Sequence, residues 1–374
     1  MQRVRLLWRR AYKVAGSEFG RRRDAVASGL GERKLDALLV SFGPNLRYLT
    51  GFTGSNGNLL VMRNQSILFT DPRYAIQSRQ ETDCKVKISA GPLLKDVISV
   101  IGRTRVRRIG YEPARVTCDV FEALKSRLPM RAALFPVKGW IEELRAIKSA
   151  EEIALIRRSV QTNSRAFEQA AARVRPGISE RDLAAELEHR MRRLGAEKPS
   201  FDTIVATGER SALPHAQPTG ARVKAGDLLL VDMGAIEDGY CSDMTRMLAI
   251  GNASPKIRRT YRAVLEAQLA AIDAVRPGAG SAAVDRVARR VLKSHGLDRA
   301  FVHSTGHGLG LEIHEPPRLG KRDKSRLQAG MTITIEPGVY LEGFGGIRIE
   351  DTVLVTDRGC EVLTPTSKDL RLVS

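Results

Sequence analysis

A glycine-rich segment near the end of the chain, residues 301–317 (FVHSTGHGLGLEIHEPP), contains three of the six histidines of the sequence. His303, His307 and His314 lie in a stretch with little helical or strand character. A single loop histidine is usually exposed to solvent, but a structural loop has no need of three. Because a neutral imidazole is a common metal ligand, the segment predicts that at least one of them faces a metal ion.

Two carboxylates upstream lie in apolar runs that flank a turn at residues 237–239. Asp232 closes the first run and Asp243 lies in the second, which is typical of two paired strands joined by a turn. Paired strands would bring the two carboxylates side by side. By the two-residue period of a strand, Cys241, Asp243 and Thr245 share a face.

Two further carboxylates follow the histidine segment. Glu336 ends an apolar strand that is stopped by Pro-Gly, and Arg348 and Glu350 are expected on one face of the next strand. Buried ions are very costly unless they are paired or bound to metal. Four acids and one imidazole carry too much negative charge for one divalent ion. We therefore predict two divalent ions about 3.5–4 Å apart that share two carboxylates and a water.

This ordered set of acids and histidine resembles the dinuclear pita-bread metallopeptidases: methionine aminopeptidase, prolidase and aminopeptidase P. The resemblance covers nearly the whole chain. The metal ligands that it implies are Asp232, Asp243, His307, Glu336 and Glu350. Four further residues resemble the proline-specific branch of the family: His215, His303, His314 and Arg348.

The resemblance also implies how the ligands divide. Asp232 would bind one metal, and His307 with Glu336 would bind the other. The bridging ligands would be Asp243 and Glu350. Glu336 would in addition accept a proton from the shared water, which two cations acidify towards neutrality so that a bridging hydroxide attacks the peptide bond.

The remaining residues receive supporting roles from the same resemblance. His314 would help to stabilise the tetrahedral oxyanion. His303 and His215 would line the pocket and bind a carbonyl or carboxylate of the substrate. Arg348 would hold a ligand in place or help to define the prolyl side. Oxygen-rich ligation with one imidazole suits Mn²⁺, with Co²⁺ or Zn²⁺ as substitutes, and the absence of thiolates argues against a structural zinc site.

The reaction implied by the resemblance is hydrolysis of the N-terminal bond in peptides with proline at the second position. An Xaa–Pro bond is a tertiary amide without the N–H that other peptidases engage. We expect an Xaa-Pro aminopeptidase, with an Xaa-Pro dipeptidase (prolidase) as the alternative, because the sequence does not reveal which loops admit a third residue. The five intact ligands disfavour a non-catalytic pita-bread binding module and a creatinase-like amidinohydrolase.

Three regions are expected along the chain. Residues 1–22 form a basic extension, and residues 23–138 form a small α/β domain in which strands and helices alternate. Its segments YLTGFTGSNG and LFTDPRY resemble the creatinase-type N-terminal domain. Residues 139–374 form the pita-bread domain, where the order helix, Val-Arg-Pro-Gly, helix and ligand-bearing strands occurs twice, which predicts two similar halves. The predicted fold class is α+β.

The formal net charge of +19 is unusual, and eight basic residues with one acid lie in residues 1–23. We expect a solvated tail there, followed by a helix at residues 24–34, and we do not expect nucleic-acid binding. No run of 18 apolar residues is present, so no membrane span is expected. The four scattered cysteines indicate reduced thiols in a cytoplasmic protein. We expect a homodimer.

Overall fold

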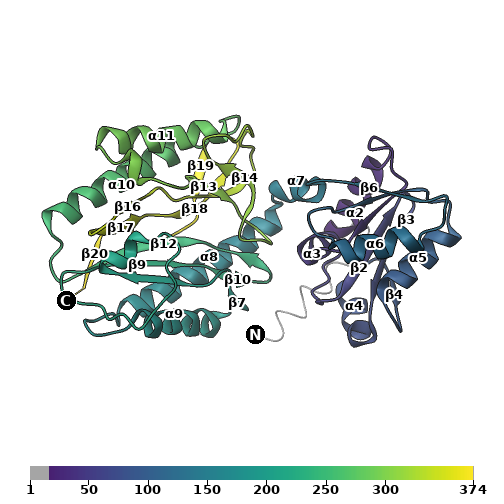
Figure 1. The fold of residues 1–374 in the computed structure, drawn as a ribbon, viewed down its shortest axis with the longest axis horizontal. Coiled ribbons are helices and arrows are strands. Elements are labelled where there is room, and N and C mark those ends of the chain that lie inside the picture. Colours follow the sequence, from purple (N-terminus) through teal and green to yellow (C-terminus); the bar gives the residue numbers. More distant parts are fainter. Residues whose placement is uncertain (1–16, 374) are drawn as a thin grey trace. The chain divides into compact units, whose positions relative to one another are not determined.

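The computed structural model describes residues 17–373. They form two compact units, one ending at Glu142 and the other beginning at Glu143 (Figure 1). Most of the predicted basic extension, residues 1–16, lies outside the described residues. None of the helices within residues 17–373 is long and apolar enough to cross a membrane.

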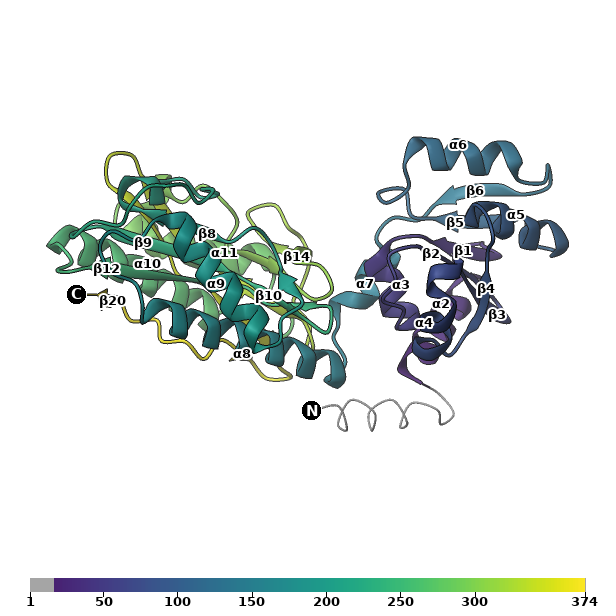
Figure 2. The same cartoon turned by 90° about the horizontal axis from the view of Figure 1, so that it is seen from below.

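The first unit is built on a six-stranded mixed sheet. Its strands are β1 (Ala37–Val40), β2 (Gly57–Met62), β3 (Gln65–Thr70), β4 (Lys85–Ile88), β5 (Arg108–Tyr111) and β6 (Ala133–Pro136). Its helices are α2 (Glu18–Gly29), α3 (Gly43–Thr50), the short 3₁₀ turn η1 (Pro72–Tyr74), α4 (Ala75–Glu81), α5 (Leu93–Arg103) and α6 (Cys118–Arg127). The strand order is β4-β3-β2-β1-β5-β6, with β1 antiparallel to β2 and parallel to β5. Apolar residues of α5 and α6 pack on one face, and α2 and α3 lie on the other (Figure 2).

The start of this unit differs from the prediction. The helix expected at residues 24–34 begins six residues earlier, as α2, and includes three arginines that were counted with the solvated tail, Arg21, Arg22 and Arg23. Arg22 Nη1 donates to the carbonyl of Tyr48 at 3.0 Å, and Arg23 Nη1 donates to that of Leu49 at 2.8 Å. These carbonyls belong to the last turn of α3, which has no intrahelical donors for them. The prediction of solvated side chains was wrong for both residues, because they are buried as caps of a neighbouring helix.

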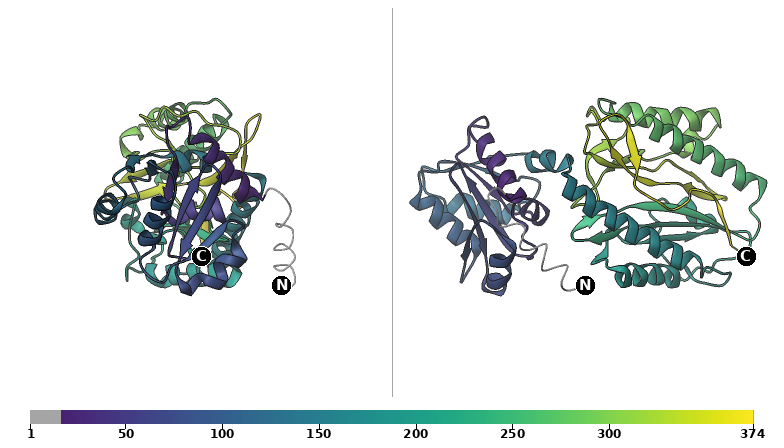
Figure 3. Two further views of the ribbon diagram at one scale, coloured as in Figure 1. Left: turned by 90° about the vertical axis from the view of Figure 1, so that its right-hand side faces the viewer. Right: turned by 180° about the vertical axis from the view of Figure 1, so that it is seen from behind.

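The second unit contains two helix pairs with strands between them (Figures 1 and 3). The helix α7 (Trp140–Ala146) crosses the unit boundary. The first pair is α8 (Ala150–Ala171) and α9 (Glu180–Leu194), and the second is α10 (Pro255–Asp273) and α11 (Ser281–Ser294). Ser179 caps α9 by accepting a hydrogen bond from the amide of Asp182. The short 3₁₀ turns are η2 (Gly208–Ala212) and η3 (Asp298–Ala300).

Four sheets of the second unit lie between these helices. One has the order β20-β12-β9-β8 and a second has the order β11-β10-β7. A third has the order β14-β13-β15-β18-β19, and β16 pairs with β17. The strands are β7 (Lys198–Pro199), β8 (Ile204–Thr207), β9 (Leu228–Met233), β10 (Ala235–Glu237), β11 (Tyr240–Cys241), β12 (Met244–Ile250), β13 (Gly306–Gly308), β14 (Glu315–Leu319), β15 (Thr332–Ile335), β16 (Gly338–Leu341), β17 (Gly345–Arg348), β18 (Asp351–Val355), β19 (Cys360–Val362) and β20 (Arg371–Val373).

The backbone repeats itself after each Val-Arg-Pro-Gly. The amide of Gly177 donates to the carbonyl of Val223 at 2.8 Å, and that of Gly278 donates to Leu327 at 2.8 Å. Both glycines have positive φ, +93° and +81°, a region that side chains disfavour. The same turn therefore joins the helices of each pair, as two similar halves require.

A second pair of glycines precedes the strands that carry acids. Gly226 and Gly330 have φ of +89° and +88°. Asp232 lies six residues after the first glycine and Glu336 six residues after the second. These two carboxylates thus occupy equivalent places in the two halves.

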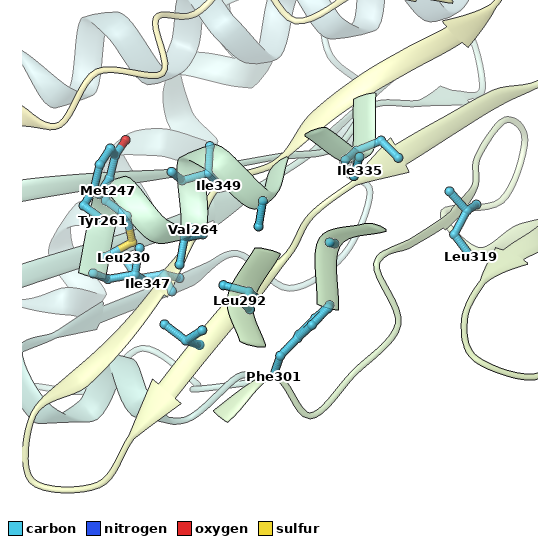
Figure 4. Close-up of a cluster of buried hydrophobic side chains, with 14 of the residues drawn as sticks. Leu230, Met247, Tyr261, Val264, Leu292, Phe301, Leu319, Ile335, Ile347 and Ile349 are labelled. Atoms are coloured by element: carbon cyan, nitrogen blue, oxygen red, sulfur yellow. The ribbon is translucent and has the colours of Figure 1, made fainter. Parts of the chain in front are cut away.

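A large apolar core supports the strands of the second half (Figure 4). Val264 of α10, Leu292 of α11, Ile335 of β15 and Ile347 of β17 are all fully buried within it. Burying such a side chain stabilises a fold by about 1.5–3 kcal/mol. The core therefore holds α10 and α11 firmly against the strands that precede Glu336 and Glu350.

The strand predicted to carry both Arg348 and Glu350 is divided. β17 ends at Arg348 and pairs with β16, whereas β18 begins at Asp351 and pairs with β15. Glu350 lies between them, and its amide donates to the carbonyl of Thr245 at 3.2 Å. The prediction of one continuous strand was wrong, because the chain changes sheets at this point.

Candidate metal centre

A cavity of about 820 Å³ in the second unit is lined by every residue that the sequence placed in the site. The set comes from segments more than a hundred residues apart. Its members are His215, Asp232, Asp243, His303, His307, His314, Glu336, Arg348 and Glu350.

The four acids lie at the ends of two antiparallel strand pairs. In the first pair, β9 and β12 align Asp232 with Thr245, and Asp243 directly precedes β12. In the second pair, Glu336 directly follows β15 and Glu350 directly precedes the residue that begins β18. Each pair contributes one acid from each strand, so the carboxylates converge where the two sheets meet.

The distances suit groups that share a cation. Donor atoms of Asp243, His307 and Glu350 all lie within 4.8 Å of one another. His307 Nε2 is 3.6 Å from an oxygen of Asp243 and 3.5 Å from one of Glu336. These separations are too long for good hydrogen bonds. Ligands at about 2.1 Å from one ion lie about 3–3.5 Å apart, so the separations fit coordination.

The electrostatics of the metal-free site are strained. Burial raises the pKa of Asp243 well above its ordinary value, and the charges of Glu350 and Asp232 raise it further. Burial, reinforced by Glu336, likewise raises the pKa of Glu350 well above the usual range. Like charges crowded in a buried site keep their protons unless a cation is present. The positive charge of the surrounding side chains therefore does not balance the negative charge of the acids, and a bound cation would.

Two buried oxygen atoms indicate where that charge belongs. Asp232 Oδ1 and Glu350 Oε1 have no hydrogen-bond partner within residues 17–373. Buried polar atoms in folded proteins are almost always satisfied. Both atoms belong to predicted ligands and line the cavity. The donor set, four carboxylates and one imidazole, therefore fits divalent cations.

The histidine of the set is held as a neutral ligand. Burial, followed by the neighbouring His314, lowers the pKa of His307 to about 4. Its Nδ1 lies 3.0 Å from the carbonyl of Gly308, an arrangement in which Nδ1–H donates and Nε2 keeps its lone pair. That lone pair lies on the side of Asp243 and Glu336.

Arg348 connects the acids to the rest of the cavity wall. Its Nη2 donates to Asp232 Oδ2 at 2.6 Å, and its Nε donates to Thr245 Oγ1 at 3.0 Å. Thr245 Oγ1 in turn donates to Glu350 Oε2 at 2.7 Å. Arg348 thus fixes the free oxygens of Asp232 and Glu350 towards the cavity.

Tyr340 extends the same network to a histidine. Its hydroxyl accepts from Arg348 Nη1 at 2.5 Å and lies 2.9 Å from His303 Nε2. His303 Nδ1 lies 2.8 Å from the carbonyl of Ser304. Burial, with Arg348 adding to it, lowers the pKa of His303 to about 4, so the neutral ring accepts the hydrogen bond of the tyrosine.

The sequence reasoning did not identify Thr245 or Tyr340 as part of the site. Thr245 shares a strand face with Asp243, and this was the available signal. Tyr340 lies on β16, opposite Gly346 of β17, two residues from Arg348. A hydroxyl in a strand is too common to indicate a site without the fold.

His314 and His215 lie at the more open side of the cavity and are both exposed. The His314 ring packs edge-on against His307, with centroids 4.3 Å apart. Partial desolvation by the surrounding atoms lowers the pKa of His314, and the nearby His215 contributes in the same direction. A neutral imidazole near neutral pH can donate a hydrogen bond without competing with cations for the acids.

Comparisons with known proteins show which family the chain is similar to. Residues 154–357 match metallopeptidase family M24, and residues 22–147 match the creatinase/prolidase N-terminal domain. The chain is 35% identical over 339 residues to the Xaa-Pro dipeptidase of Pyrococcus furiosus, covering 91% of this chain and 96% of that protein.

Solved structures show the same similarity. The Xaa-Pro dipeptidase from Bacillus anthracis has a TM-score of 0.92 at 36% identity and covers 95% of this chain and 100% of that one. The X-Pro aminopeptidase from Thermotoga maritima has a TM-score of 0.87 at 36% identity and covers 91% and 99%. The predicted fold, a pita-bread domain after a creatinase-type domain, is confirmed. The chain belongs to the metallopeptidase family M24.

Proposed function

We propose that the protein is an Xaa-Pro dipeptidase that uses two divalent metal ions. The observation that carries the proposal is the complete donor set gathered in one cavity of an M24 chain. The sequence alone favoured an Xaa-Pro aminopeptidase. The names of the relatives favour the dipeptidase alternative, because both the Pyrococcus furiosus protein and the Bacillus anthracis structure are described as Xaa-Pro dipeptidases.

In this proposal Asp232 would hold one cation, and His307 with Glu336 would hold the other. Asp243 and Glu350 would contribute to holding both cations. Bound divalent cations lower the pKa of a water and polarise a carbonyl. Glu336, which lines the cavity beside His307, would accept a proton from the attacking water.

Three histidines act on the substrate rather than on the cations. His314 donates a hydrogen bond to the carbonyl oxygen as negative charge develops there. It is suited to this because it is exposed to the cavity and its pKa is lowered, so it is neutral. His303, held by Tyr340, lines the prolyl side with His215. Arg348 has the role of holding Asp232 in position through their ion pair.

An arginine at the cavity wall supports a dipeptide as substrate. Arg318 is exposed and lines the cavity, and no acidic side chain within residues 17–373 lies in ion-pair distance of it. A guanidinium binds a carboxylate with two parallel hydrogen bonds. In a dipeptide the prolyl residue carries a free carboxylate, whereas in a longer peptide that group is an amide.

Xaa-Pro dipeptides and the matching Xaa-Pro-Xaa tripeptides test the proposal, with Mn²⁺ added to metal-stripped protein. We expect kcat/KM for the dipeptide to exceed that for the tripeptide by about 100-fold, the scale of one lost charged contact. Arg318→Met should remove most of this preference. Arg326→Met is the matched control, because Arg326 is exposed in the same segment and does not line the cavity. Equal rates for both substrates would contradict the dipeptidase assignment.

An Xaa-Pro aminopeptidase is the second candidate. The similarity to the Thermotoga maritima structure favours it, because that structure is described as an X-Pro aminopeptidase. Faster hydrolysis of the tripeptide, with no effect of Arg318→Met, is the outcome that this candidate predicts.

We also propose that the metal is manganese, that the protein is a homodimer and that it is cytoplasmic. An oxygen-rich set with a single imidazole supports Mn²⁺. Metal analysis of the purified protein and its elution in size-exclusion chromatography test the first two. A nickel or iron content equal to that of manganese, or elution as a monomer, would count against them.

A further inference from the structure

A group of charged side chains, three of them buried and one half-buried, lies beside the candidate metal centre. It consists of Arg145, Lys148, Glu312 and Glu315. Glu315 Oε1 is 2.5 Å from Arg145 Nη2, and its Oε2 is 3.0 Å from Lys148 Nζ. Glu312 Oε2 is 3.0 Å from Arg145 Nη2. Two cations balance two anions, so this group needs no metal ion.

The carboxylate of Glu315 also closes the turn that contains His314. Its Oε1 accepts the amide of Glu312 at 3.1 Å. A Cβ on Gly310 would lie 2.8 Å from the same oxygen, so the backbone of the turn packs directly on the carboxylate. The carbonyl of Gly310 accepts the amide of Cys241 at 2.7 Å. Residues 310–315 are therefore folded around one buried oxygen pair.

His314 depends on this turn for its direction. Within residues 17–373 its ring has no hydrogen-bond partner, and its ring–ring contact is with His307. It is exposed, in contrast to Glu315, whose side chain is 2% accessible. The main chain at residues 312–315 is thus what holds the imidazole in place.

The cations that clamp Glu315 are themselves fixed. The amide of Lys148 donates to the carbonyl of Gly330 at 2.9 Å, at the start of the chain leading into β15. The next residue, Ser149, caps α8 in a capping box with Glu152. Burial works to raise the pKa of Glu315, but Lys148 and Arg145 outweigh it and hold the pKa below its ordinary value. The carboxylate is therefore ionised and rigidly held.

We propose that Glu315 is a positioning residue that aims His314 at the carbonyl of the substrate. Its clamped carboxylate holds the turn at residues 312–315, and the turn holds the imidazole. The inference rests on the proposed function of His314 as hydrogen-bond donor to the developing oxyanion. A displaced catalytic group of this kind costs about 10²-fold in rate for a shift of about 1 Å.

A double-mutant cycle tests the connection. Glu315→Gln should lower kcat for an Xaa-Pro dipeptide by about 10–100-fold in the wild-type background, with KM and metal content nearly unchanged. In the His314→Ala background the same substitution should change kcat by less than about twofold, because the group that it positions is absent. A loss of equal size in both backgrounds overturns the proposal.

Asp285 provides the matched control for this cycle. It is another buried acid, paired with Arg289 at 2.8 Å, and it accepts from Thr305 Oγ1 at 2.9 Å. It therefore anchors the segment near His303 rather than the turn of His314. Asp285→Asn should lower kcat by the same factor with and without His314.

Hydrogen exchange gives a reading that does not depend on the reaction. In Glu315→Gln, a peptide covering residues 310–315 should exchange at least about tenfold faster, because the amide of Glu312 loses an ionic acceptor. Asp285→Asn should leave this peptide unchanged. If Glu315→Gln leaves the exchange rate of this peptide unchanged, the positioning proposal is overturned, whichever substrates the wild type hydrolyses. If the wild type does not hydrolyse Xaa-Pro dipeptides but Glu315→Gln still accelerates exchange, only the proposed function is refuted.

Glu315→Gln leaves two buried cations facing one acid, which can prevent folding. The charge-balanced double variant Glu315→Gln with Lys148→Met removes this difficulty. It should fold with restored thermal stability but retain the low kcat and the fast exchange. Recovery of full kcat in this variant would overturn the proposal, since the defect would then be one of stability.

Discussion

Replacing Glu336 by glutamine should stabilise the metal-free protein at alkaline pH. Burial, together with the charge of Asp232, raises the pKa of Glu336 from 4.5 to about 7. The Glu336 side chain is 17% accessible, so solvent screens little of this effect. The difference of about 2.5 in pKa corresponds to about 3 kcal/mol that ionised Glu336 costs the folded state. Glutamine keeps the shape of the side chain and removes that cost.

The direction in which pH changes the free energy of unfolding follows from proton binding by Glu336. Between pH 4.5 and about 7 the folded protein keeps the proton of Glu336 and the unfolded chain releases it. The folded state then binds more protons, so the free energy of unfolding falls as pH rises. The variant should therefore gain about 3 kcal/mol at pH 8 and about 1 kcal/mol at pH 5. Histidines with lowered pKa titrate alike in both proteins, and their contribution cancels in the comparison.

Calorimetric unfolding in EDTA at pH 5 and pH 8 measures this difference. For a unit of this size, about 3 kcal/mol corresponds to a Tm higher by about 6–12 °C. Glu342→Gln is the matched control, because Glu342 is exposed in the turn after β16. Saturating Mn²⁺ should stabilise the wild type more than Glu336→Gln, because the variant has lost a ligand. A variant that is less stable than the wild type in EDTA at pH 8 would refute the reasoning.

Three further substitutions address the site directly. Asp243→Ala should abolish turnover and lower the bound metal measured by elemental analysis, and full metal loading with activity would contradict its role as a ligand. His314→Ala should lower kcat by about 10²–10³-fold with normal metal content, the scale of one lost oxyanion donor. Arg348→Lys keeps the charge but cannot reach Asp232, Thr245 and Tyr340 together, so metal affinity in titration calorimetry should fall by about 10–100-fold. An unchanged affinity would argue that these hydrogen bonds do not orient the ligands.

The acids and histidines of the cavity were predictable because of their chemical type. A carboxylate such as Asp232 or Glu336 at the end of an apolar strand is costly, and the structure places both in one cavity. The start of α9 also has a local signal, because Ser179 caps this helix within three residues. Local rules suffice where cause and effect are close in sequence.

Other features depend on partners that are distant in sequence. Arg22 and Arg23 look like part of a basic tail, and only the packing of α2 on α3 makes them caps. Thr245 and Tyr340 belong to common residue types, and they join the site through Arg348, up to 103 residues away. The break between β17 and β18 follows from sheet pairing, which a period of two cannot detect.

The amino-acid sequence by itself determined which acids and histidines line the cavity, the alternation of helix pairs with acid-bearing strands, and the repeat of the two halves. These follow from charge in apolar strands, from capping serines and from glycines that adopt positive φ. The tertiary structure alone decided which oxygens stay unpaired and which residues aim the histidines. The reason is that hydrogen bonds such as Arg145 to Glu315 join atoms 170 residues apart, and their geometry exists only once both halves are packed.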